Sequence, residues 1–171
     1  MTAASELLVD AFGRIHDVVH STVDGLSTEQ LAVRLDADAN SIAWLIWHLT
    51  RVQDDHIADV ADREQRWTAG GWVEEFGLPF DADALGYGQS SAEVGELAGV
   101  TAERLLNYFD EVHEYTLGYL RALSDRDLDR VVDDAWDPPV TLAVRLVSVI
   151  SDDLQHAGQA AYVKGIVQRR G

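Results

Sequence analysis

The sequence contains no cysteine, so no disulfide can stabilise the fold and no side-chain thiol is present. This absence fits a reducing compartment such as the cytoplasm. No apolar run approaches the roughly 18 residues of a membrane-spanning helix, and the first residues lack a basic stretch followed by an apolar core. We therefore expect a cytoplasmic protein with no membrane partner.

Basic side chains are also scarce, with 13 Lys and Arg residues against 30 Asp and Glu residues and a formal net charge of −17. Such a charge repels phosphate backbones and anionic membrane surfaces. A nucleic-acid partner is therefore not expected. Lys164 is the only lysine, a bias that is typical of a GC-rich bacterial genome.

At 171 residues the chain is long enough to bury a normal core, and we predict a single domain over residues 1–171. Apolar residues recur with the 3.6-residue period of an α-helix, and no segment alternates convincingly as a strand does. The sequence therefore predicts an all-α fold, and four long helices favour a four-helix bundle.

Local signals suggest where three of these helices begin. Asn40 or Ser41 can cap the second helix, and Ser90 opens the third with a capping-box pattern. Pro138 and Pro139 are tolerated in the first turn of the fourth, where their missing N–H groups would be unpaired in any case. The predicted helices cover residues 5–23, 41–63, 90–120 and 138–165.

A weak internal repeat accompanies the helices. Residues 25–35 and 122–132 share the pattern Leu-Ser-x-x-x-Leu, and each precedes a loop that leads into the second or fourth helix. The repeat favours up-down helix pairs related by a pseudo-twofold axis. The alternative is a common capping signal that occurs twice by coincidence.

A long segment, residues 65–89, separates the second and third helices. Loops of this length in compact domains are usually functional or disordered. The segment is rich in aromatic residues, which favours an ordered lid, although it could also cover the end of the bundle and do nothing else. Its aromatic residues are Trp67, Trp72, Phe76, Phe80 and Tyr87.

Three candidate metal ligands stand on two of the predicted helices. Asp152 and His156 are four residues apart, about 40° around a helix, so both leave the same face one turn apart. His48 follows the apolar run SIAWLIW on the second helix. Two imidazoles and one carboxylate are a ligand set that zinc accepts, with one position left open for chemistry.

Other polar residues interrupt the same helix faces, and buried ionisable groups are costly unless they are paired or bound to metal. This pattern predicts a polar pocket inside the bundle. A buried core histidine and a simple acid–imidazole pair are the alternatives. His16, His20 and His113 have no identifiable partners. The side chains assigned to the pocket are Trp44, Asp55, His56, Trp67, Trp72, Arg145 and Gln159.

The segments WLIWHLTRVQDDHIADV and SDDLQHAGQAAYVKG resemble the second-helix and fourth-helix motifs of the DinB-like superfamily, in particular its mycothiol-dependent transferase and maleylpyruvate isomerase branch. The resemblance covers the whole chain. It implies a four-helix bundle with a divalent metal, zinc above all and otherwise nickel or another ion, held by His48, Asp152 and His156. Asp152 departs from the family pattern, which has histidine or glutamate there.

The resemblance implies an enzyme that uses a small-molecule thiol such as mycothiol, because the chain has no cysteine of its own. A metal can lower the pKa of this thiol, which then attacks or isomerises an electrophilic substrate. A homodimer is an expected assembly. Two alternatives stay open: a metal-dependent hydrolase with Asp55 or Asp153 as general base, and a non-catalytic, stress-associated dimeric bundle whose site has decayed.

Overall fold

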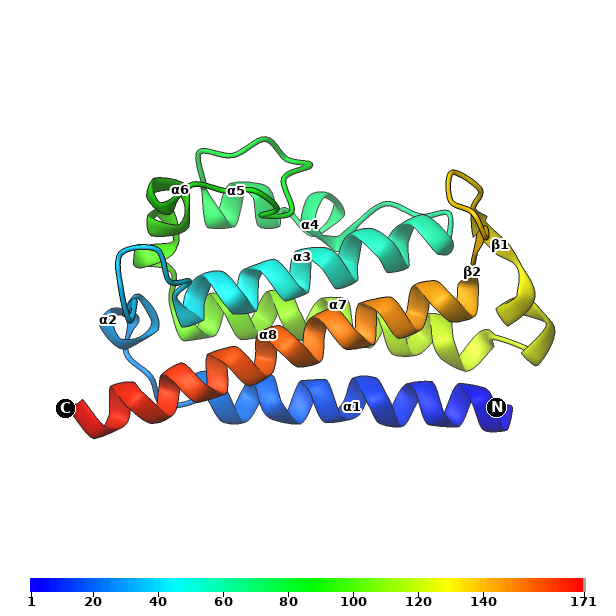
Figure 1. Ribbon diagram of the computed structural model, residues 1–171, viewed down its shortest axis with the longest axis horizontal. Helices are drawn as coiled ribbons and strands as arrows, with labels where there is room; N and C mark the ends of the chain where they lie inside the picture. The colour runs from blue at the N-terminus through cyan, green and yellow to red at the C-terminus, as the bar shows by residue number, and fades with distance from the viewer. Residues whose placement is uncertain (171) are drawn as a thin grey trace.

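The computed structural model describes residues 1–170, and most of them are helical, as the apolar period predicted (Figure 1). None of the helices in this range is both long and apolar enough to cross a bilayer. The four long helices are α1 (Ala3–Val23), α3 (Ile42–Val60), α7 (Ala102–Ala122) and α8 (Leu142–Arg170). The shorter elements are α2 (Thr28–Leu31), α4 (Arg66–Ala69), α5 (Trp72–Phe76), α6 (Ser91–Gly95), the 3₁₀ helices η1 (Glu96–Gly99) and η2 (Asp125–Asp129), and the strands β1 (Val131–Asp133) and β2 (Val140–Thr141).

The long helices lie side by side in two antiparallel pairs. In Figure 1, α1 and α8 run in one direction and α3 and α7 run in the other. Helix α3 contacts α8 and α7, and α1 contacts the same two helices from the other side. The interface of α3 with α8 and that of α1 with α7 are therefore opposite flanks of the molecule, and each joins two antiparallel helices.

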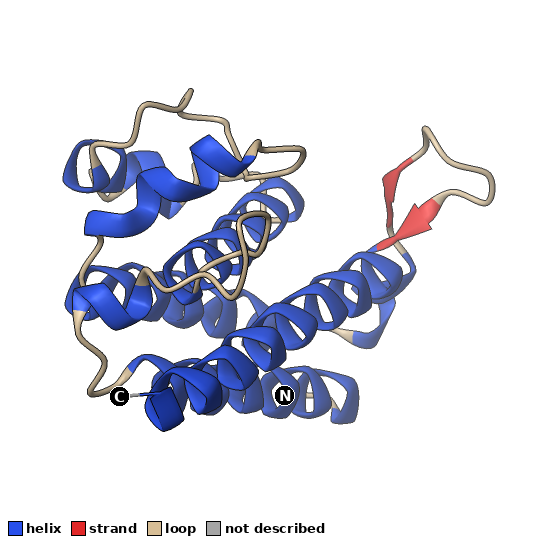
Figure 2. Cartoon of the chain, turned by 60° about the vertical axis from the view of Figure 1, so that its left-hand side comes forward, coloured by secondary structure: helices blue, strands red, loops and turns tan. Residues whose placement is uncertain are grey.

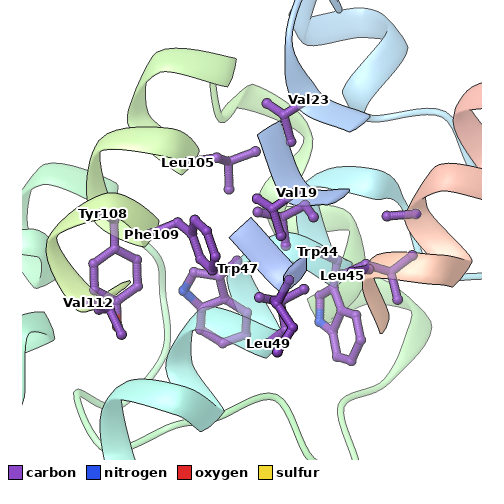
Figure 3. Close-up of a cluster of buried hydrophobic side chains, with 14 of the residues drawn as sticks. Val19, Val23, Trp44, Leu45, Trp47, Leu49, Leu105, Tyr108, Phe109 and Val112 are labelled. Atoms are coloured by element: carbon purple, nitrogen blue, oxygen red, sulfur yellow. The ribbon is translucent and has the colours of Figure 1, made fainter. Parts of the chain in front are cut away.

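Helix α3 is buried on nearly every face, which is typical of a helix surrounded by protein. Its Trp47 and Leu49 side chains meet Val19 of α1 and Phe109 of α7 in the core (Figure 3). Ser41 caps this helix by accepting a hydrogen bond from the Trp44 N–H at 3.1 Å. The buried position of α3 explains why a polar group on it, such as His48, must find a partner inside the protein.

The third predicted helix is interrupted. Ser90 forms the expected capping box with Glu93, but α6 ends at Gly95 and η1 ends at Gly99. Val100 is then extended, and Thr101 caps a new helix, α7. The prediction of one helix over residues 90–120 was wrong because two glycines weaken the helix between two independent capping residues.

The fourth helix begins and ends later than predicted. Pro138 and Pro139 lie in the turn of a two-stranded antiparallel hairpin, β1–β2, which projects from one end of the long helices (Figure 2). These strands contain valine and threonine, whose branched side chains favour extended backbone. At the other end, α8 continues past Gly165 because the buried Val167 extends its apolar stripe.

The long segment after α3 contains α4 and α5, followed by irregular backbone to residue 90, and two buried polar residues of α3 anchor it. Asp54 accepts hydrogen bonds from the backbone N–H groups of Arg66 and Trp67 at 2.8 and 2.7 Å. Arg51 donates to the carbonyls of Ala82 and Ala84. Both side chains are fully buried. They hold the segment against α3 at two places, residues 66–67 and residues 82–84.

Candidate metal centre

His48, Asp152 and His156 converge between α3 and α8. One ligand atom from each lies within 4.8 Å of the other two. The Nε2 atom of His156 is 3.7 Å from Oδ1 of Asp152, and the two imidazole ring centres are 4.8 Å apart. Two ligand atoms on one tetrahedral zinc ion, each about 2.1 Å from it, lie about 3.4 Å apart. The three side chains therefore need only small movements to hold one ion.

The hydrogen bonds of both histidines leave the correct nitrogen free. Nδ1 of His48 faces the backbone carbonyl of Leu85 at 2.5 Å, and Nδ1 of His156 faces Oε1 of Gln159 at 3.2 Å. Since these oxygens can only accept, each Nδ1 carries the proton and each Nε2 keeps its lone pair. A partner of this kind on the second nitrogen is what orients a metal-ligating histidine.

Two further observations fit a cation at this position. Oδ2 of Asp152 is buried and has no hydrogen-bond partner among the described residues. Such an acceptor is costly unless something positive or a donor meets it. Burial lowers the pKa of His48 below its ordinary value, outweighing the opposing effect of the Leu85 carbonyl. The ring is therefore neutral at pH 7, as a ligand must be.

Aromatic side chains flank the ligands. Trp44 stacks on His48 with ring centres 4.6 Å apart, and its indole N–H donates to Gln89 at 2.6 Å. Tyr87 meets the His48 ring edge-on at 5.0 Å and is largely exposed. Between Leu85 and Tyr87, Gly86 has a φ of +104° and passes so close that a Cβ atom there would lie 2.8 Å from Nδ1 of His48. Only glycine fits this position without displacement.

Of the residues that sequence reasoning assigned to a pocket, Trp44 lies beside His48 and Gln159 beside His156, whereas Leu85, Gly86 and Tyr87, which also lie beside His48, were not assigned to it. The Gly-Tyr-Gly run was the available signal, because glycines on either side of an aromatic residue indicate a tight backbone approach.

Arg145 and Asp55, the charged residues assigned to the pocket, both lie beside His56. Arg145 donates to Asp133 of the hairpin at 3.0 Å and lies 3.0 Å from Nδ1 of His56. Asp55 accepts from Gln65 at 2.8 Å and lies 3.6 Å from His56. Burial, followed by the charge of Arg145, lowers the pKa of His56. Arg145 is therefore held in a structural ion pair and braces the hairpin against α3.

Trp67 and Trp72, also assigned to the pocket, lie elsewhere. The Trp67 ring packs on Tyr108 of α7 with centres 5.2 Å apart, and Trp72 packs on Tyr108 at 5.5 Å. The Trp72 indole N–H donates to Glu111, also on α7. The two tryptophans therefore fill the space between the long segment and α7. Residues 85–89, and not these tryptophans, lie against His48 and Trp44.

Asp153, next to the ligand Asp152, points into the core instead. Both of its carboxylate oxygens are buried without a hydrogen-bond partner among the described residues. Burial, and secondarily the charge of Asp152, raises the pKa of Asp153 well above its ordinary value. The neutral carboxylic acid is a poor general base, so Asp153 does not suit the role considered for it.

Comparison with known proteins supports this fold. A crystal structure of a conserved protein from Enterococcus faecalis superposes with a TM-score of 0.90 at 26% sequence identity, with 98% of each chain covered. No protein with a curated description matches the chain significantly. The family model of the DinB superfamily matches residues 11–160. The chain therefore belongs to the DinB superfamily.

Proposed function

We propose that this protein is a divalent-metal-dependent enzyme that uses a small-molecule thiol of the mycothiol kind, for sulfur transfer or for thiol-assisted isomerisation of an electrophilic substrate. Members of the superfamily often bind divalent metals. The observation that carries the proposal is the convergence of one ring nitrogen from each of His48 and His156 on the carboxylate of Asp152, of which Oδ2 has no hydrogen-bond partner among the described residues. Zinc fits this donor set.

A divalent ion held by His48, Asp152 and His156 would supply positive charge that lowers the pKa of a bound thiol. The chain supplies the surroundings. The Trp44 ring stacked on His48 limits the water around the ligands. Tyr87 keeps its proton at pH 7, because partial burial and then the charge of Asp152 raise the pKa of its hydroxyl above the ordinary value. Its exposed hydroxyl can therefore donate to an oxygen of the substrate.

The absence of cysteine makes an external thiol necessary for this chemistry. The hydrolase alternative has less support, because it needs a general base near the ligands. Asp153 is buried as a neutral acid, and Asp55 accepts a hydrogen bond from Gln65 and lies beside His56. The decayed-site alternative does not account for two histidines that each carry an oriented hydrogen bond.

We also propose that the chain consists of two related helix pairs. Ser27 and Ser124, which occupy the same place in the Leu-Ser repeat, each form a capping box at the start of a short helix. The homodimer stays a prediction, as do the identity of the metal and that of the thiol.

Cobalt substitution tests the proposal directly. Because the chain has no cysteine, a sulfur-to-cobalt charge-transfer band in the cobalt-loaded protein can come only from an added thiol. We expect mycothiol or a close analogue to produce this band and to change the tetrahedral cobalt spectrum. The same titration should quench the fluorescence of Trp44, which lies against the ligand His48.

The matched controls are His48→Ala, which removes a ligand, and Trp72→Phe, which removes an indole that packs against α7. The band should disappear in the first variant and persist in the second. A panel of thiols that leaves the fully loaded protein spectrally unchanged would refute the thiol-dependent function, as would substrate turnover that proceeds equally well without thiol.

A further inference from the structure

A second cluster of metal-ligand side chains lies on the opposite flank, between α1 and α7. It consists of His16 and His20 on α1 and Asp110 on α7, and one ligand atom from each lies within 4.8 Å of the other two. Nε2 of His16 and Nε2 of His20 are 3.2 and 2.6 Å from the same oxygen of Asp110. Three donor atoms thus converge on one point from two helices.

The spacing of these atoms approaches that of a metal site. Donor atoms around a tetrahedral zinc ion lie about 3.4 Å apart, so the rings of His16 and His20 need to move outward by less than about 1 Å. The two histidines are four residues apart, which places them on one helix face one turn from each other. The same i, i+4 spacing is used by histidine pairs that bind zinc from a helix.

We propose that His16, His20 and Asp110 form a second divalent-cation site, of the zinc type, that joins α1 to α7. Each of the three side chains is between three-tenths and half exposed, so an ion can reach them from solvent. The ion replaces the proton that otherwise links His20 to the carboxylate of Asp110. The fourth coordination position faces solvent and takes water.

The surroundings favour a cation. Nδ1 of His16 lies 3.8 Å from Oδ1 of Asp17, so a second carboxylate adds negative charge beside the ring. The buried His113 ring lies beside His16, with centres 4.6 Å apart, and its Nδ1 has no hydrogen-bond partner among the described residues.

The cluster repeats the arrangement of the first site. In both, one helix supplies two ligands four residues apart and an antiparallel helix supplies the third. The first site joins α3 to α8, and the second joins α1 to α7. An ion at the second site connects two helices that are distant in sequence, so its binding stabilises the folded state by an amount that rises with the free ion concentration relative to the dissociation constant.

Zinc binding should be measured in a background that lacks the first site, His48→Ala combined with His156→Ala, with any affinity tag removed. Equilibrium dialysis against Zn²⁺ followed by elemental analysis should find about one ion per chain in this background. His20→Ala and, separately, the near-isosteric Asp110→Asn should each remove it. The thermal unfolding midpoint of the background protein should rise with Zn²⁺ concentration, and this rise should vanish in both variants.

Asp10→Asn is the matched control. It removes one carboxylate from α1 that pairs with Arg14 and contributes no ligand, so zinc binding should persist. A background protein that binds no zinc, or that binds it equally well after His20→Ala and Asp110→Asn, overturns the proposal. So does a loss of stability in His20→Ala that is the same with and without Zn²⁺, because that result means the cluster is only hydrogen-bonded.

Discussion

Replacing Gly86 by alanine should weaken metal binding at His48, Asp152 and His156, although Gly86 supplies no ligand. The added Cβ would lie 2.8 Å from Nδ1 of His48 and 3.0 Å from the Trp47 ring, which are distances that real Cβ atoms almost never show. The backbone φ of +104° also disfavours any side chain. The segment must therefore shift away from α3.

Leu85 directly precedes Gly86 in the sequence, so the shift also moves the Leu85 carbonyl away from Nδ1 of His48. Strained backbone of this kind costs about 1–3 kcal/mol. Losing the partner that orients a ligating histidine typically lowers metal affinity about 10- to 100-fold, which corresponds to about 1.4–2.7 kcal/mol. The strain lowers the stability of the folded protein, whereas the lost partner lowers metal binding, and we expect zinc affinity to fall by about 10- to 100-fold.

Competition with a chromophoric chelator measures this loss, in protein that also carries His20→Ala to silence the second cluster. Gly88→Ala is the matched control, since Gly88 lies in the same segment with a positive φ of +71° but a Cβ there meets no atom within 4 Å. Its zinc affinity should change by less than about threefold. Equal zinc affinity in Gly86→Ala and the parent protein would contradict the role assigned to the Leu85 carbonyl.

Three further outcomes are expected. Asp54→Ala should lower the free energy of unfolding, measured by urea titration, by about 3–5 kcal/mol. The substitution leaves the buried Arg51 charge and two backbone N–H groups unpaired. A loss below about 1 kcal/mol would argue against this anchor. Asp152→Glu should hold or strengthen zinc affinity in chelator competition and Asp152→Asn should weaken it sharply, whereas equal affinity in all three proteins would mean that Asp152 is only a neighbour. Relative to the parent protein, the metal-free Asp153→Asn variant should become increasingly more stable as pH rises above 3.8. In that range the unfolded parent releases the Asp153 proton while the folded parent keeps it, which costs the parent stability. Parallel curves of stability against pH for the two proteins would exclude a raised pKa of Asp153.

Much of the fold could be predicted from the sequence because helices depend on short-range features. The 3.6-residue apolar period located all four long helices, and Ser41 and Ser90 cap helices as expected. The boundaries that failed are those where local signals compete. Gly99 and Thr101 divide the third helix, and the hairpin takes Pro138 and Pro139 out of the fourth.

The candidate site divides in the same way. Asp152 and His156 are one helical turn apart, so their proximity follows from the sequence alone. That His48 lies near them was predicted from its apolar setting and from the family resemblance, and only the structure shows the three side chains together, since nothing local connects α3 to α8. The cover over His48 was misassigned to Trp67 and Trp72, because an aromatic residue in a long segment does not reveal which helix it will pack against.

The sequence by itself determined the helices, their caps and the ligand pair within one turn of α8, because hydrogen bonds and side-chain neighbours within a helix involve residues at most four positions apart. Only the tertiary structure decided which faces meet. The carbonyl of Leu85 reaches His48 from 37 residues away, and Asp110 reaches His20 from 90 residues away. Such contacts depend on how packed helices exclude water from their apolar faces, and this requires all four helices at once.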